Sequence, residues 1–331
     1  MKPLVVLTLG IDAQAHAALE RHARVLVLPD TSPDTIRRAV AQAHAVMVRA
    51  PLPDDVFECG PGLLGAVRHG AGVDMIPVAA ATAAGVPVAN VPGVNASTVA
   101  EYVVGQMLQW SRRLARVDQT LRREGWASAR AQADAGRDLC GRTLGIVGAG
   151  AIGAALARAA GLGLGMTVLG HRRSPGELPA PMQRASLDEV IEQSDFLALS
   201  CPLTVHTQGL IGARELARMK AGAVLVNVSR GAVVVQADLV DALARGHLGG
   251  AVLDVYEAQP LPADSPLLGF DHVLLTPHMA GITADSMRRM GLLAVSQTLD
   301  LLAGRRPPHL VNPEVWPHRR RSPFTTNPEP A

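Results

Sequence analysis

Short apolar runs recur through the first part of the chain, with segments of helical hydrophobic pattern between them. The runs span Leu4–Leu9, Arg24–Leu28, Ala45–Val48, Leu64–Arg68 and Val86–Ala89. Apolar stretches of this length are typical of buried strands, whereas the intervening segments repeat their apolar positions with helical spacing. The alternation predicts a parallel sheet with helices packed on its faces.

A second series of apolar runs begins near the middle of the chain and predicts six further strands. These runs span Leu144–Val147, Met166–Gly170, Phe196–Ser200, Ala223–Val228, Gly250–Asp254 and Val273–Thr276. Strands alternating with helices in this number are the expected content of a doubly wound nucleotide-binding domain.

Capping residues suggest where the longest helices begin and end. Thr98-x-x-Glu101 has the form of a capping box and predicts a long helix that starts here and continues to about Arg123. A last helix is predicted over Thr283–Leu302, with Gly304 as its stop signal. From Arg305 onward the chain is rich in Pro and Arg, and we expect it to be irregular.

Three glycines follow the first strand of the second series, in the pattern Gly148-x-Gly150-x-x-Gly153, with Ala151 and Ile152 between the last two. The first glycine allows a sharp turn, the second allows backbone to approach a pyrophosphate, and the third lets helix pack on strand. The helix that follows offers free N–H groups and a positive dipole end to phosphates. The alternative is an ordinary turn, but a strand before and a helix after favour a dinucleotide site.

Composition and charge narrow the class of protein. The 331 residues are 48% hydrophobic and 18% charged, with a formal charge of +2, which indicates a globular protein and gives no case for nucleic-acid binding. The basic cluster Arg319–Arg321 lies in the Pro-rich tail, and we expect it to be a solvated end. Cys59, Cys140 and Cys201 share no metal-ligand spacing, so we expect reduced thiols and no metal. With no apolar run long enough for a signal peptide or a membrane span, we expect a soluble cytoplasmic protein.

Several ordered motifs stand at predicted strand ends, where open α/β sheets bind their ligands. They are residues 201–204 (CysProLeuThr), 227–231 (AsnValSerArgGly), 253–261 (LeuAspValTyrGluAlaGlnProLeu) and 275–281 (LeuThrProHisMetAlaGly). Together with the glycine motif and with residues 68–74, 90–95 and 311–315, this series resembles the D-isomer-specific 2-hydroxyacid dehydrogenase family over nearly the whole chain.

The resemblance implies two doubly wound parallel-sheet α/β domains, with a Rossmann nucleotide domain inserted into a flavodoxin-like substrate domain. The substrate domain would comprise residues 1–97 and 283–331, and the nucleotide domain residues 98–282. Closure of the cleft between them would bring the backbone of Ala71 and Gly72, which holds the substrate carboxylate in the family, towards Arg230 and His278. Family members are commonly dimers through the nucleotide domain, so a homodimer is implied.

Hydride transfer between a nicotinamide and a 2-oxo acid needs a cation for the carboxylate and a group that moves the hydroxyl proton. Arg230 suits the first task, because a guanidinium holds a carboxylate in a forked geometry and keeps its charge. His278 suits the second, because imidazole titrates near neutrality. In the family the position of His278 is the proton donor and acceptor.

Gln259 departs from the family pattern. Most members have Glu here, paired with the catalytic histidine; a neutral amide can orient the ring but supplies no charge. The family's formate dehydrogenases carry Gln at this position, so formate oxidation is an alternative. A cofactor-sensing binding protein similar to the family's transcriptional corepressors is another. The loop at residues 71–74 and the Arg230–His278 pair favour reduction of a small 2-oxo acid such as glyoxylate or hydroxypyruvate.

The end of the second nucleotide-domain strand bears on cofactor choice. NAD-dependent members place an acid there for the ribose 2′-hydroxyl, but this chain reads His171, Arg172, Arg173 and Ser174. Two arginines and no carboxylate favour NADP(H) over NAD(H), which stays possible. The further cofactor contacts that the resemblance implies are Cys201, Pro202, Val228, Ser229, Arg230, Asp254, His278 and Gly281.

Overall fold

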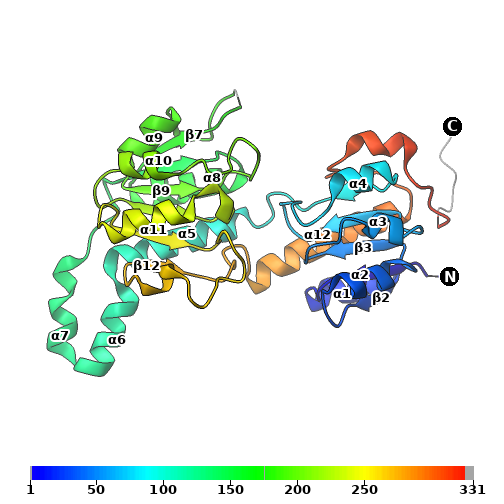
Figure 1. Cartoon of the computed structure of the whole chain (residues 1–331), viewed down its shortest axis with the longest axis horizontal. Helices are drawn as coiled ribbons and strands as arrows, with labels where there is room; N and C mark the ends of the chain where they lie inside the picture. The colour runs from blue at the N-terminus through cyan, green and yellow to red at the C-terminus, as the bar shows by residue number, and fades with distance from the viewer. Residues whose placement is uncertain (1, 175, 325–331) are drawn as a thin grey trace. The chain divides into compact units, whose positions relative to one another are not determined.

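The structure is a computed structural model that describes residues 2–174 and 176–324. It divides into two compact units, Met1–Asn95 with Ile282–Ala331, and Ala96–Gly281. Each unit is built on its own parallel sheet (Figure 1). None of the helices in the described ranges is long and apolar enough to cross a membrane.

The first unit is a three-layer α/β sandwich with the sheet order β2-β1-β3-β4-β5, the flavodoxin-like order. Side chains alternate between its faces: Leu7 packs with the α1 and α12 side, and Val6 with the α2, α3 and α4 side. Its elements are β1 Leu4–Leu7, α1 Ala13–Glu20, β2 Arg24–Val27, α2 Pro33–Val40, β3 Ala45–Val48, α3 Val56–Cys59, β4 Gly65–Arg68, α4 Val78–Ala83, β5 Val88–Ala89, α12 Ala284–Leu302 and η5 Pro313–His318.

The second unit carries the larger sheet, in the order β12-β11-β10-β9-β6-β7-β8. Its strands are β6 Thr143–Val147, β7 Thr167–His171, β8 Gln183–Arg184, β9 Phe196–Leu199, β10 Val224–Asn227, β11 Gly250–Leu253 and β12 Val273–Leu275. The chain reverses its direction of progress between β6 and β9, as in a dinucleotide-binding Rossmann sheet. Ligands bind at such a switch point, beyond the carboxyl ends of the strands.

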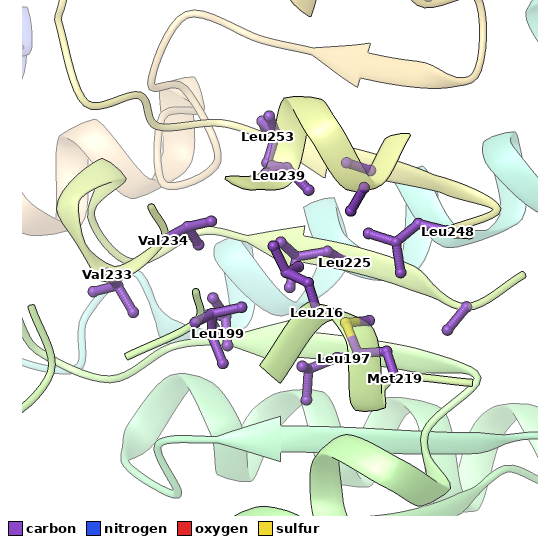
Figure 2. Packing of buried hydrophobic residues seen from close by; sticks show 14 of the residues in the cluster. Leu197, Leu199, Leu216, Met219, Leu225, Val233, Val234, Leu239, Leu248 and Leu253 are labelled. Atoms are coloured by element: carbon purple, nitrogen blue, oxygen red, sulfur yellow. The ribbon is translucent and has the colours of Figure 1, made fainter. Parts of the chain in front are cut away.

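Helices pack on both faces of this sheet, and further helices of the unit lie outside it. They are α5 Ala96–Arg112, α6 Leu114–Glu124, α7 Trp126–Ala131, η1 Ala133–Ala135, α8 Ala151–Arg158, η2 Ala159–Gly163, α9 Leu187–Gln193, α10 Ala213–Arg218, η3 Gly231–Val233, α11 Gln236–Ala244 and η4 Pro266–Gly269. Helices α5 and α8 pack on one face and α9, α10 and α11 on the other. Figure 2 shows the second core, where Leu225 of β10 lies among Leu216 of α10 and Leu239 of α11. Burial of each such leucine stabilises the fold by about 1.5–3 kcal/mol.

The sheets agree with the predicted α/β architecture, and every predicted strand is present. One strand was missed: β8 consists of two exposed polar residues, Gln183 and Arg184, which give no apolar run. The last helix also has the predicted start, because Thr283 caps α12 by accepting the Ser286 N–H.

The predicted helix from Thr98 to Arg123 is wrong at its start and in its middle. Helix α5 begins at Ala96, so Thr98 lies inside it and does not cap it. Arg113 then adopts a left-handed backbone (φ 54°), which ends α5 and separates it from α6. A left-handed arginine carries no sequence signal, because the residue expected there is glycine.

The expectation of a solvated tail is wrong, whereas that of an irregular tail holds outside residues 313–318. Residues 313–318 form a short 3-10 helix, and Arg319 stacks over the ring of Trp316 at 3.9 Å. The Arg320 guanidinium donates to the carbonyls of Phe57, Gly60, Leu63 and Ala84. Arg320 therefore ties the tail to the helix ends of the first unit, and of the three arginines only Arg321 is exposed.

Candidate active site

The glycine loop after β6 has the shape that a pyrophosphate requires. A Cβ at Gly148, whose φ is 105°, would lie 2.5 Å from the Cys201 nitrogen, and one at Gly153 would strike the Gly148 carbonyl. A Cβ at Gly150, in contrast, would meet nothing within 4 Å, so this glycine faces open space. No side chain caps α8, whose first residues are Ala151 and Ile152, so its first N–H groups face outward for a ligand. The loop therefore fits a dinucleotide.

Residues that follow β9 hold the glycine loop in place. Ser200 Oγ donates to the Gly148 carbonyl at 2.8 Å, and Cys201, the next residue, is buried against Gly148. Pro202 continues this segment and is exposed. Sequence reasoning named Cys201 and Pro202 but missed Ser200, whose role depends on a contact 52 residues away.

The residues expected to select the cofactor stand at the end of β7. His171 closes the strand, and its Nδ1 lies 3.4 Å from the Ala185 carbonyl. Arg172 is half-buried, Arg173 and Ser174 are exposed, and among the described residues neither guanidinium forms an ion pair. Two arginines without an ion-pair partner in the described part of the chain give this strand end a positive potential.

Arg230 lies three residues beyond β10, in a loop fixed by its own backbone. The Asn227 side chain donates to the Arg230 carbonyl at 3.0 Å and accepts from the Ser229 N–H and hydroxyl. A Cβ at Gly231 would collide with the Tyr256 backbone, so only glycine allows the loop to sit this close to the segment after β11. Val228 pairs with Leu199 of β9. The guanidinium is half-buried and donates to the Ser229 carbonyl.

His278 and Gln259 contact each other beyond β12 and β11, at one end of the sheet order. The His278 Nδ1 lies 3.0 Å from Gln259 Oε1, and Gln259 Nε2 is 3.5 Å from the Tyr256 carbonyl. The contact that the sequence pattern predicts is therefore present. Because an amide oxygen only accepts, Nδ1 carries the proton in this contact.

The backbone of His278 is left-handed, with φ 55°, which is uncommon for a residue other than glycine and costs on the order of 1 kcal/mol or more. Asp254, only 2% exposed at the end of β11, holds the loop. Its carboxylate accepts from the Thr276 hydroxyl (2.6 Å) and from the backbone N–H groups of Met279 and Ala280 (both 2.8 Å). The two oxygens of the Asp254 carboxylate thus already accept three hydrogen bonds from within this unit. Gly281 is the last residue of the same loop.

An apolar pocket of about 540 Å³ opens beside this pair. It is lined by Tyr256, Gln259, Pro260, Leu261, Leu275, Thr276, Pro277 and His278. His278 therefore stands at the wall of a space that can receive a small organic molecule.

In the first unit, the loop at Ala71 and Gly72 follows β4. Asn90 Nδ2 donates to the Ala71 carbonyl at 2.6 Å and Arg68 Nε donates to the Gly72 carbonyl at 3.0 Å. With both carbonyls tied down, neither of the two N–H groups has an acceptor among the described residues. Such paired backbone donors suit a carboxylate.

No group of three or more metal-ligating side chains occurs among the residues that the structure describes. The comparisons with known proteins address the cofactor instead. Residues 104–280 match the model of the D-isomer-specific 2-hydroxyacid dehydrogenase NAD-binding domain.

Curated relatives and solved structures cover nearly the whole chain. A glyoxylate reductase of Korarchaeum cryptofilum is 37% identical over 324 residues, 95% of this chain and 97% of that protein. A glyoxylate/hydroxypyruvate reductase B of Yersinia pestis is 34% identical over 95% of this chain and 99% of its own length. A structure of NADPH-dependent glyoxylate/hydroxypyruvate reductase from Sinorhizobium meliloti, in complex with NADP and malonate, has a TM-score of 0.85 and 28% identity, covering 97% of this chain and 100% of that one.

The motifs, both sheets and these full-length similarities agree. The chain belongs to the D-isomer-specific 2-hydroxyacid dehydrogenase family and is an NAD(P)-dependent enzyme of that family.

Proposed function

We propose that the protein reduces a small 2-oxo acid, glyoxylate or hydroxypyruvate, to the D-2-hydroxy acid with NADPH. The observation that carries the proposal is the joint placement of Arg230 and His278 beyond strand ends of the seven-stranded sheet, with Gln259 on the histidine ring. The names of the similar glyoxylate and hydroxypyruvate reductases support the substrate class.

The substrate carboxylate binds to Arg230, whose guanidinium forms a forked, charge-assisted pair with it and polarises the adjacent carbonyl. The free N–H groups of Ala71 and Gly72 bind the same carboxylate. When bound, the nicotinamide supplies the hydride. The protein's own task is then to hold the keto carbon and to deliver one proton to its oxygen.

His278 donates that proton from Nε2. Gln259 accepts from Nδ1 and keeps the ring oriented, but it adds no negative charge. The protonated ring is therefore held less firmly than beside a carboxylate, and the reduction is favoured towards lower pH.

NADPH is preferred because Arg172 and Arg173 bind the 2′-phosphate, with Ser174 as a further donor. The Gly148–Gly153 loop would hold the cofactor's pyrophosphate, and Cys201, Pro202, Val228, Ser229, Asp254 and Gly281 would line the remainder of its site. The NADP-bound structure of the Sinorhizobium meliloti enzyme is consistent with this preference.

The experiment is a turnover assay of the purified protein with glyoxylate and hydroxypyruvate, each with NADPH and with NADH. We expect turnover of both acids and a kcat/KM at least about tenfold higher with NADPH. Equal rates with the two cofactors would contradict the cofactor preference alone.

Gln259 favours a second candidate, formate oxidation, which needs no proton transfer at the substrate. Formate-dependent reduction of NAD or NADP, with no activity on any 2-oxo acid, would establish it. Cofactor binding without turnover of either kind would instead support a cofactor-sensing binding protein.

The protein forms a homodimer through the second unit, in our proposal. Helices α6 and α7 project as a hairpin from this unit, and Leu114, Leu121 and Trp126 on it are 54%, 42% and 75% exposed (Figure 1). Exposed apolar side chains on one projection mark an association surface. Light scattering should give twice the mass of the chain, and Trp126→Glu should shift it to monomer.

The three free cysteines fit a cytoplasmic location.

A further inference from the structure

The chain has two tyrosines, and the hydroxyl groups of both bond to Thr276. Tyr102 of α5 places its hydroxyl 2.5 Å from Thr276 Oγ1. Tyr256, after β11, shares its one hydroxyl proton between the Thr276 carbonyl at 2.8 Å and the Leu253 carbonyl at 3.0 Å. Thr276 lies two residues before His278, so both aromatic side chains act on the loop that presents this histidine.

The hydrogen bonds from Tyr102 run in one direction only. Thr276 Oγ1 lies 2.6 Å from Asp254 Oδ1, and a carboxylate accepts, so the threonine donates there. A hydroxyl has one proton, and Tyr102 must therefore donate to Thr276. Burial raises the pKa of Tyr102 to about 12, so the phenol keeps its proton at any working pH. The result is a directed chain from Tyr102 through Thr276 to Asp254.

Asp254 fixes the backbone on both sides of His278. Its carboxylate accepts from Thr276 before the histidine and from Met279 and Ala280 after it. The His278 N–H donates to the Asp254 carbonyl at 2.9 Å. A left-handed histidine persists only where its surroundings enforce it, and these contacts supply the enforcement.

We infer that Tyr102 is a positioning residue: through Thr276 and Asp254 it holds the His278 backbone in its left-handed conformation and thereby keeps the imidazole against Gln259. The inference rests on the proposed role of His278 as the proton donor. Tyr102 itself touches neither His278 nor Gln259 through any contact found among the described residues, so its effect on catalysis is indirect.

The kinetic test is a cycle of Tyr102→Phe, Thr276→Val and the double variant. Each removes a hydroxyl and keeps the shape of the side chain. We expect each single variant to lower kcat for glyoxylate reduction about 3- to 10-fold, with KM and NADPH affinity within about twofold. Because both substitutions break the same chain, the double variant should be no slower than Thr276→Val. Thr276→Ser keeps the hydroxyl and should retain nearly the rate of the unmodified protein.

The pH profile distinguishes positioning from general destabilisation. If His278 is no longer held in place, its ring loses the hydrogen bond to the Gln259 amide oxygen, which stabilises the protonated form. The alkaline limb of kcat/KM should therefore move to lower pH in both single variants. Thr298→Val is the matched control, because Thr298 is a buried threonine of α12 whose hydroxyl bonds to the Ala294 carbonyl in the first unit. It should leave the profile unchanged.

A spectroscopic measurement tests the hydrogen bonds without activity. Protein labelled with 3-fluorotyrosine should give two ¹⁹F signals. Thr276→Val keeps the carbonyl that Tyr256 uses, so the Tyr102 signal should shift more than that of Tyr256. An unmoved Tyr102 signal, or rate losses that multiply in the double variant, would overturn the inference. Failure of the unmodified protein to reduce any 2-oxo acid would refute the proposed function and leave the ¹⁹F test standing. If Tyr102→Phe does not fold, the Val and Ser variants of Thr276 carry the comparison.

Discussion

His69 and His278 both stand beyond the carboxyl end of a parallel strand, one in each unit, and their surroundings are opposite. His69 follows β4, is 4% exposed, and its Nε2 is buried without a hydrogen-bond partner among the described residues. Burial first, and the nearby Arg49 charge next, lower the pKa of His69 to about 4. His278 follows β12, is exposed, and has an amide oxygen on Nδ1.

The difference shows that position at a strand end does not by itself make a histidine an acid. His69 is kept neutral by its environment and belongs to the packing of the first unit. His278 is exposed on a strained loop that Asp254 holds, and its Nδ1 contacts the Gln259 amide oxygen. The contrast between the buried His69 of the first unit and the exposed strand ends of the second unit suggests four experiments.

The largest effect is expected at the end of β7 in the second unit, where Arg172 is half-buried and Arg173 is exposed. Replacing both by Gln should weaken NADPH binding by roughly 10²- to 10⁴-fold and leave NADH binding nearly unchanged, because each lost charge-assisted contact costs about 1.5–3 kcal/mol. Fluorescence titration measures both affinities. Replacing Arg305 and Arg306 of the first unit removes the same net charge and serves as the control. A uniform loss for both cofactors would mean that the arginines do not contact the 2′-phosphate.

Arg230→Lys tests the other displayed cation. Lysine keeps the charge but loses the fork, so kcat/KM for glyoxylate should fall about 10²- to 10³-fold while NADPH affinity survives. Arg214→Lys, at an exposed arginine of α10, should have no effect. Near-normal turnover in the Arg230 variant would remove it as the carboxylate clamp.

Local patterns and long-range contacts differ in what the sequence reveals of them. Strands such as Phe196–Leu199 were predictable because four buried residues in a row give a distinct apolar run. Arg230 and His278 were predictable because the family motifs surround them. The bonds of Arg320 to Phe57 and of Tyr102 to Thr276 join residues 263 and 174 positions apart. No spacing rule connects residues at such separations, so these contacts became visible only in the folded chain.

The burial of His69 leads to a prediction about the stability of the protein in acid. Because the pKa of His69 is lowered on folding, the unfolded chain binds a proton between about pH 6.5 and pH 4 that the folded chain does not. The folded state therefore loses stability as the pH falls below about 6.5. The free energy of unfolding should decrease by about 2 kcal/mol between pH 7 and pH 5.

The measurement is urea unfolding at both pH values, followed by the fluorescence of Trp316 in a background with Phe at positions 110 and 126. His69→Leu should flatten this pH dependence, whereas His22→Gln, at an exposed histidine of the same unit, should not. Equal slopes for the unmodified protein and His69→Leu would show that His69 is not the group that titrates.

The smallest effect concerns the neutral partner of His278. Under the proposed function, His278 supplies the proton that reduction of a 2-oxo acid consumes, so activity should fade as the pH rises. A carboxylate at Nδ1 stabilises the imidazolium, and Gln259→Glu should therefore extend the alkaline limb of kcat/KM for glyoxylate by about one pH unit, equivalent to about 1.4 kcal/mol. The same change at Gln193, an exposed residue at the end of α9 just before β9 begins, adds a charge to this unit at the opposite edge of the sheet and controls for net charge. Since Gln259 Oε1 already lies 3.0 Å from the ring, a Glu oxygen can take its place without rearrangement. An alkaline limb that stays in place would mean that proton delivery does not pass through the Gln259-bound imidazole, and the displayed histidine would then be no more an acid than the buried one.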